Sequence, residues 1–268
     1  MIRRRAPCGL GYPCRFAAET RPAMRTIRIH VDHAPLTIGA SLALPAQAGE
    51  HVARVLRMGV GDPLVLFNGD GHDYTASITE AGKRQVSVAI TGCTAVVGES
   101  PLRLVLAQAV ARGEKMDLIV QKATELGVCA IVPLLTERSE VKLDADRAAR
   151  RLAHWQAVIA SACEQSGRAV LPSIGTPQPL ATWLDALADR SALRLALLPD
   201  GSCRPRELAP GAAGALLVVG PEGGLGERDV ACLLAHGFQG LQLGPRILRT
   251  ETAGMAALAA LQALHGDL

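Results

Sequence analysis

Aromatic side chains are scarce in this chain: Phe, Trp and Tyr make up 3% of its 268 residues. Proteins that hold single-stranded nucleic acid regardless of its sequence usually stack bases on several aromatic rings. The composition argues against such a platform. Any nucleic acid bound by this chain is expected to be recognised through its shape and its backbone.

Paired cysteines, long apolar runs and the common phosphate-binding motifs are also missing. The seven cysteines are scattered and include no Cys-x-x-Cys pair, which argues against a disulfide framework and a zinc site. We expect no metal and a reduced, cytoplasmic protein. No run of 18 apolar residues predicts a membrane span. Neither Gly-x-Gly-x-x-Gly after a first strand nor Gly-x-x-x-x-Gly-Lys-Ser/Thr occurs, so a dinucleotide or P-loop enzyme is not indicated.

Positive charge is concentrated at the start of the chain. Residues 1–23 contain five Arg and one Glu, a net charge of +4, whereas the whole chain carries +3; residues 24–268 therefore carry 3 − 4 = −1. RNA binding by this nearly neutral body requires a local basic patch. The leading segment lacks periodicity and the apolar stretch of a secretory signal, and is expected to be a disordered, dispensable extension.

Two patterns follow one another along the body of the chain. Residues 24–96 contain short strand-like runs at 27–31, 64–67, 74–78 and 86–90, a turn at 68–71 and a short helix at 49–58, which predicts a small β-barrel. From Pro101 strands and helices alternate, with strands predicted at 102–107, 130–135, 195–198 and 215–219 and helices at 114–126, 145–165 and 252–265. This alternation predicts a parallel α/β sheet over residues 100–268.

Two glycine-bearing loops near the C-terminus are the most informative feature. The first, GPEGG at 220–224, leaves the apolar run 215–219; Gly223, Gly224 and Gly226 tolerate positive φ, and Glu227 is expected in the first turn of the next helix. Loops between a strand and a helix present backbone N–H groups where ligands bind in α/β sheets. Glu222 is expected either to contact the charged end of a ligand or to bond to nearby backbone.

The second loop, LGPRILRTETA at 243–253, leaves the apolar run 241–243. Pro245 stiffens the turn, and Thr250 is expected to cap the following helix with Glu251 in its first turn. Arg249 offers a permanently charged planar fork, suited to phosphate or an enolate-like oxygen. The helix at 252–265 is apolar on nearly every face, which predicts burial against its own sheet or a second subunit.

These loops, together with the segments 51–62, 112–128, 137–139 and 162–168, resemble the 16S rRNA (uracil-N3) methyltransferase family of the SPOUT superfamily over residues 24–265. The resemblance implies a SPOUT-type parallel sheet with a C-terminal trefoil knot, preceded by a small PUA-like β-barrel that binds RNA. It also implies S-adenosyl-L-methionine as cofactor, the small ribosomal subunit as partner, and a homodimer.

The site residues that we expect on this basis fall into three groups. Arg249 is expected to stabilise charge on the uracil, and Glu251 is a candidate proton acceptor. The expected cofactor-binding residues are Leu198, Gly220, Glu222, Gly223, Leu243, Gly244, Ile247, Leu248, Thr250 and Ala253. The expected RNA contacts are Arg54, Arg57, Arg112, Lys115, Lys122, Arg138 and Arg168.

Two other functions are compatible with the same loops. One is a SPOUT methyltransferase that acts on tRNA, and the other is a non-catalytic RNA-binding factor of ribosome assembly with a vestigial pocket. The intact segment 243–253 argues against the second, and the segments before it favour a ribosomal substrate.

Overall fold

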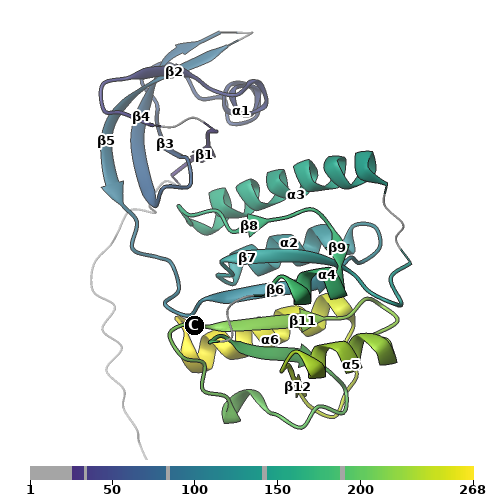
Figure 1. Ribbon diagram of the computed structural model, residues 1–268. Coiled ribbons are helices and arrows are strands. Elements are labelled where there is room, and N and C mark those ends of the chain that lie inside the picture. Colours follow the sequence, from purple (N-terminus) through teal and green to yellow (C-terminus); the bar gives the residue numbers. More distant parts are fainter. Residues whose placement is uncertain (1–25, 33–34, 83–84, 141–143, 188–190) are drawn as a thin grey trace, which may run out of the picture.

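The computed structural model describes residues 26–32, 35–82, 85–140, 144–187 and 191–268, so the leading basic segment lies outside the described residues. The described chain forms two sheets, each with its own hydrophobic core (Figure 1). None of the helices within these ranges is long and apolar enough to cross a membrane.

The first sheet contains five strands in the order β1-β3-β4-β5-β2. They are β1 (Arg28–His30), β2 (Ser41–Ala43), β3 (Pro63–Phe67), β4 (His72–Ala81) and β5 (Val86–Ala95). Alternate residues of β4 and β5 face a core that includes Val52 and Leu64. The pairing is an open path from β1 to β2, so among the described residues the expected barrel is an open, curled sheet.

The helix predicted at 49–58 begins and ends earlier in the chain than expected, and it is less regular. Helix α1 spans Ala46–Glu50 and continues as a π-helix, η1, over His51–Val55. Arg57 lies beyond its end with a φ of 56°, so Arg54 and Arg57 do not share a helix face. The sequence pattern also missed β2, whose three residues carry no clear alternation.

The second sheet is parallel throughout, with the order β12-β10-β11-β6-β7-β8 and with β9 also paired to β7. Its strands are β6 (Leu104–Ala109), β7 (Ala130–Leu135), β8 (Ser173–Ile174), β9 (Gln178–Pro179), β10 (Leu193–Leu197), β11 (Ala215–Val219) and β12 (Gln239–Leu241). The predictions for β7 and β11 are confirmed to the residue, and the parallel α/β class is confirmed.

Helices cover both faces of this sheet, as a buried parallel sheet requires. Helices α2 (Lys115–Glu125), α3 (Ala145–Ser166) and α6 (Thr250–His265) contribute to a core with Leu106 and Leu217. Helices α4 (Leu180–Asp185) and α5 (Glu227–Ala235) pack with Ala107 and Val218 on the other face. A short 3-10 helix, η2, spans Pro205–Glu207.

The last helix, α6, is less buried than its composition predicted. Ala257, Leu258 and Leu261 are fully buried, whereas Met255 and Ala259 are partly exposed and Leu264 keeps 49% of its surface. One face therefore packs on the sheet and the other remains partly open. Burial of one face against the sheet of the same chain is confirmed, and burial of the other face against a second subunit stays a prediction.

Candidate active site

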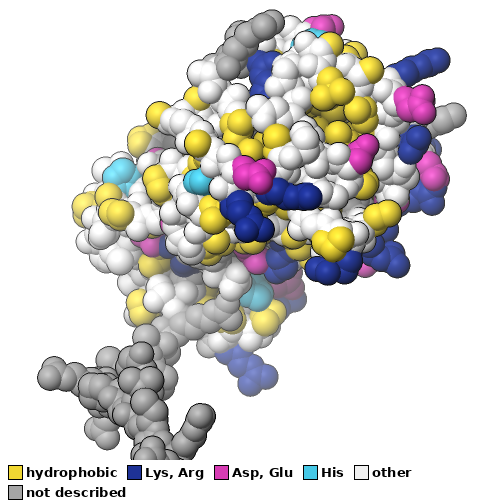
Figure 2. All heavy atoms as spheres, turned by 90° about the horizontal axis from the view of Figure 1, so that it is seen from below, with side chains coloured by type: hydrophobic (Ala, Val, Ile, Leu, Met, Phe, Trp, Pro, Cys, Tyr) yellow, Lys and Arg dark blue, Asp and Glu magenta, His cyan; other side chains and the backbone are white. Residues whose placement is uncertain are grey.

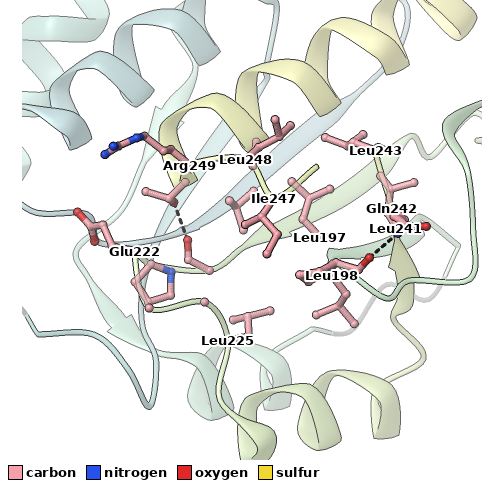
Figure 3. Close-up of a pocket in the computed structure, with 18 of the residues that line it drawn as sticks. Leu197, Leu198, Glu222, Leu225, Leu241, Gln242, Leu243, Ile247, Leu248 and Arg249 are labelled. Carbon is pink, nitrogen blue, oxygen red and sulfur yellow. Dashed lines mark hydrogen bonds between the residues drawn. The ribbon is translucent and has the colours of Figure 1, made fainter. Parts of the chain in front are cut away.

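A cavity of about 630 Å³ opens at the carboxyl ends of β10, β11 and β12. Three loops line it: residues 197–200 after β10, 219–225 after β11 and 241–251 after β12 (Figure 3). All twelve residues expected to bind the cofactor or act in catalysis line this cavity. Its volume is within the usual range for small-molecule sites, roughly 300–1,000 Å³.

The first loop folds tightly after β11. Of the three glycines that tolerate positive φ, Gly224 uses it, with a φ of 72°, whereas Gly226 has a φ of -76°. Gly226 is required for space instead, because a Cβ there would meet the Glu137 carboxylate. Glu227 lies in the first turn of α5, as predicted.

The segment 137–139, which follows β7, forms hydrogen bonds with the first loop and the start of α5. The backbone N–H of Glu137 donates to the buried Asp229 carboxylate at 3.1 Å, and Glu137 accepts from the N–H of Arg228 at 3.3 Å. Arg138 Nη1 donates to the carbonyl of Gly223 at 3.0 Å. Arg138, expected to contact RNA, therefore supports the cavity wall.

Thr250 joins the two glycine-bearing loops rather than capping α6. Arg249 occupies the N-cap position, and the Thr250 hydroxyl donates to the carbonyl of Gly220 at 2.6 Å. The buried side chain of Gln108, at the end of β6, donates from Nε2 to the same hydroxyl at 3.0 Å. The expected capping role of Thr250 is wrong because its hydroxyl is engaged 30 residues away.

The cavity has an apolar wall and a polar end. The apolar wall comprises Leu197, Leu198, Leu225, Leu241, Leu243, Ile247 and Leu248. Ile247 is 85% exposed, so this side chain at the rim has its surface available to a ligand. In Figure 3, Glu222 and Arg249 lie together at the opposite side from Leu198 and Leu243.

Two carboxylates and one ammonium organise the polar end. Lys115, the first residue of α2, lies 3.3 Å from a carboxylate oxygen of Glu222 and 4.0 Å from one of Glu251. That buried Glu251 oxygen has no hydrogen-bond partner among the described residues. Lys115, expected at an RNA surface, is therefore part of the cavity.

Glu222 is held in its charged form. Burial raises the pKa of its carboxyl, but hydrogen bonds from its own backbone, from the backbone N–H of Arg112 and from Lys115 outweigh burial and lower that pKa below its ordinary value. Of the two expectations for Glu222, the bond to nearby backbone is confirmed; its contact with the charged end of a ligand stays a prediction, and its side chain lines the cavity.

The remaining expected RNA contacts are divided between surface and core. Arg54, Arg57 and Arg112 are exposed, although Arg54 pairs with Glu50 and Arg112 with Glu140. Lys122 pairs with Glu125 on α2. Arg168 is only 7% exposed and bonds to protein groups, so its assignment to RNA is wrong. Within the described ranges no cluster of three or more side chains is suited to hold a metal ion.

Sequence reasoning missed several lining residues because they come from distant segments. Lys115 lies in the segment after β6 and Arg138 in the segment after β7, and both side chains line the cavity. Asp200 follows β10, and Gln242 immediately precedes the second glycine-bearing loop. A signal was available, since side chains that follow adjacent parallel strands meet at one edge of the sheet.

Comparison with known proteins agrees with this geometry. An RNA methyltransferase domain model matches residues 98–262, and an RNA methyltransferase PUA domain model matches residues 44–91. Ribosomal RNA small subunit methyltransferase E of Buchnera aphidicola is 31% identical over 91% of this chain and 98% of its own length.

Two solved structures are similar over nearly the whole chain. A putative methyltransferase from Legionella pneumophila, in complex with the bound cofactor SAM, is 43% identical with a TM-score of 0.86, over 91% of this chain and all of that one. Ribosomal RNA small subunit methyltransferase E from Neisseria gonorrhoeae, bound to S-adenosyl methionine, is 37% identical with a TM-score of 0.85, over 90% and 99% of the two chains. The chain therefore belongs to the ribosomal RNA small subunit methyltransferase E family of RNA methyltransferases.

Proposed function

We propose that this protein transfers a methyl group from S-adenosyl-L-methionine to N3 of a uridine in 16S ribosomal RNA of the small subunit. The observation that carries the proposal is the single cavity formed by both glycine-bearing loops, with an apolar wall and a charged end. An S-adenosyl group has matching parts: a flat, weakly polar adenine and a charged amino-acid end. Relatives of this chain are named ribosomal RNA small subunit methyltransferase E.

The lining residues suit the methyl donor in three ways. The leucines of the apolar wall, with Ile247, can enclose the adenine ring. Gly220, Gly223 and Gly244 lack side chains, so a ligand can approach the backbone of both loops. The orphaned Glu251 oxygen and the Glu222–Lys115 pair offer hydrogen-bonding groups inside the cavity.

Methylation of uracil N3 demands positioning and charge stabilisation from the protein. When bound, the donor supplies an electrophilic methyl on a sulfonium. The imide proton of N3 has to leave, and negative charge then develops on O2 and O4 of the base. Arg249, at the N-terminus of α6, brings a fixed positive charge to the polar end and is our candidate for stabilising that charge.

Glu251 is our candidate proton acceptor. Its buried Oε2 has no hydrogen-bond partner in the described part of the chain, and Lys115 lies 4.0 Å from that oxygen. An unsolvated carboxylate oxygen beside the reacting base can accept a hydrogen bond from N3–H and then its proton. Lys115, which also pairs with Glu222, would hold the Glu251 carboxylate in place.

RNA binding is proposed for the exposed basic side chains Arg54, Arg57 and Arg112 and for the partly exposed Lys122. Residues 24–96 would act as the PUA-like RNA-binding domain and 100–268 as the methyltransferase domain. The PUA domain match supports this division. The near-neutral body means that binding depends on such local charges. Because the substrate belongs to the ribosome, we place the activity in the cytoplasm.

We also propose a homodimer and a C-terminal trefoil knot, as in the SPOUT superfamily. The partly exposed side of α6 supports a dimer, since Met255 and Leu264 are apolar and incompletely covered. Figure 2 views the molecule from below and shows hydrophobic side chains gathered in patches on that face. Sedimentation at micromolar concentration is expected to give twice the mass of the chain; a monomer would contradict the dimer.

Mass spectrometry of ribosomal nucleosides tests the function. In a strain that lacks this protein, 16S rRNA is expected to lose one 3-methyluridine, and the wild-type gene is expected to restore it. The Arg249→Ala variant, expressed at the same level, is expected to restore much less 3-methyluridine than the wild-type gene. Unchanged 3-methyluridine would contradict the proposal, and loss of a methylated nucleoside from tRNA would favour a tRNA substrate.

A further inference from the structure

Arg168 lies where the small sheet, the linker and the methyltransferase sheet meet. It follows Gly167, which ends α3 in the left-handed conformation with a φ of 83°. Although charged, Arg168 is only 7% exposed. A buried guanidinium is tolerated only when its N–H groups have partners, so the contacts of Arg168 show which segments it joins.

The guanidinium makes four hydrogen bonds to two separate segments. Nε and Nη2 donate to the two carboxylate oxygens of Glu99 at 3.2 and 2.6 Å, in a forked pair. Nη1 donates to the carbonyls of Thr124 at 2.8 Å and Val128 at 3.0 Å, just where α2 ends. Glu99 belongs to the linker between β5 and β6. Arg168 therefore ties the linker to the C-terminal end of α2.

The small sheet attaches at the same point. Arg28 in β1 donates from Nη2 to the carbonyl of Arg168 at 3.0 Å, pairs with Asp73 in β4 and lies 4.8 Å over the Phe67 ring. One residue further, the carbonyl of Ala169 accepts from the N–H of Gly71 at 3.2 Å.

A second contact fixes β1 on α3. The backbone N–H of His30 donates to the Glu164 carboxylate at 2.9 Å. Burial raises the pKa of the neighbouring Cys163 thiol to about 11. The junction is thus a hydrogen-bonded contact rather than a loose tether, and Figure 1 shows the small sheet standing over this end of α3.

Helix α2 connects this junction to the cavity. Its C-terminal end receives Arg168, and its first residue, Lys115, contacts Glu222 and Glu251. A helix of 11 residues is a stiff rod of roughly 16 Å. The orientation of the small sheet is therefore set relative to the same element that organises the polar end of the cavity.

We propose that Arg168, with Glu99, is a positioning residue that fixes the small sheet relative to the donor cavity. RNA bound to the small sheet is thereby aligned with the active site. This inference rests on the proposed function. It assigns Arg168 no contact with RNA or donor. Misplacing a bound substrate by about 1 Å can cost roughly 100-fold in rate, so a loosened junction is expected to weaken catalysis with RNA selectively.

The test compares Glu99→Ala and Arg168→Lys with wild-type full-length protein. Glu99→Ala removes the linker contact and leaves the bonds from Arg168 to Thr124 and Val128, whereas Arg168→Lys keeps a positive charge beside Glu99 but loses the forked pair. We expect kcat/KM with small ribosomal subunits to fall about tenfold or more. The dissociation constant for S-adenosyl-L-methionine, from calorimetry, is expected to stay within about twofold of wild type because the cavity is intact.

Two further measurements keep the outcome decisive. Arg206→Ala, which removes the same charge from exposed η2, is the matched control and is expected to keep wild-type kcat/KM. Small-angle X-ray scattering of Glu99→Ala should show a larger radius of gyration than wild type. Unchanged kcat/KM and scattering would overturn the proposal, and so would an equal loss of donor affinity. Wild-type protein without any methylation activity would instead refute the proposed function.

Discussion

The hydroxyl of Thr250 donates a hydrogen bond of 2.6 Å to the carbonyl of Gly220, and this bond joins two loops that are 30 residues apart in the chain. Gln108 donates to the same hydroxyl at 3.0 Å, so the three residues form a chain of hydrogen bonds beneath the cavity. Both glycine-bearing loops are thereby held as one site, at the ends of β11 and β12, the strands on either side of β10.

Replacing Thr250 by Val is expected to weaken donor binding. The change keeps the shape of the side chain and removes the hydroxyl, leaving the Gly220 carbonyl without this bond. A net loss of about 1 kcal/mol, or roughly fivefold in the dissociation constant for S-adenosyl-L-methionine, should follow. Thr252→Val, on the exposed side of the same helix turn, is the control and should bind as wild type. Equal effects of both changes would contradict the role of this bond.

Arg249→Ala is expected to separate binding from turnover. The cavity and its apolar wall remain, so donor affinity should be nearly unchanged. Loss of the group that stabilises charge on the base should lower kcat by about 100-fold or more. Single-turnover methylation of small subunits measures this, with Arg249→Lys expected to keep part of the rate. Near-wild-type methylation by Arg249→Ala would refute the assignment.

Glu251→Gln probes the proton acceptor. The amide is nearly isosteric but cannot take a proton, so the rate of the chemical step should fall by about 100-fold while the affinity for RNA is kept. The informative measurement is the rate against pH. If Glu251 is the acceptor, the residual rate of the variant should rise with pH more steeply than that of wild type, because hydroxide then has to remove the proton. Parallel profiles would argue against Glu251.

The lowered pKa of Glu222 predicts a defined acid dependence. A carboxyl whose pKa is lower in the folded state than its ordinary value of 4.5 contributes stability that is complete above that value and is lost as the pH falls through the lowered value. The difference in unfolding free energy between wild type and Glu222→Gln should therefore be constant from pH 7 down to about 5 and shrink only below it. A difference that already shrinks near neutral pH would contradict the contacts from Arg112 and Lys115.

Gly226→Ala is expected to destabilise the first loop. The new Cβ would collide with the Glu137 side chain, which in turn accepts from the N–H of Arg228. Overpacking of this kind typically costs about 1–3 kcal/mol in unfolding free energy, measured by urea denaturation. Gly175→Ala, where a Cβ meets nothing within 4 Å, is the control and should leave stability nearly unchanged.

The residues show where sequence reasoning succeeds. Strands β7 and β11 are continuous apolar runs bounded by turn residues, and their limits could be predicted to the residue. The two loops were recognisable because glycine, proline and a helix start occur together immediately after a strand. The residues of the cavity that lie within those loops followed directly.

What sequence reasoning could not supply depends on distant partners. Thr250 has the residue type of a helix cap, but a carbonyl at Gly220 competes for its hydroxyl. Arg168 is of a residue type that often contacts phosphate, yet it is buried and bonds to Glu99 and to two backbone carbonyls. The π-helical turn at His51–Val55 ends before Arg57, which has a positive φ, so the helix predicted over 49–58 does not include both Arg54 and Arg57. For Thr250 and Arg168, tertiary contacts override a local preference that was correctly identified.

Calorimetric titration of S-adenosyl-L-methionine into the full-length protein shows whether the two glycine-bearing loops form one donor site. We expect saturable binding at one site per chain, weakened by Thr250→Val but not by Thr252→Val. The absence of binding to the folded wild-type protein, or binding that is indifferent to Thr250, would contradict this expectation.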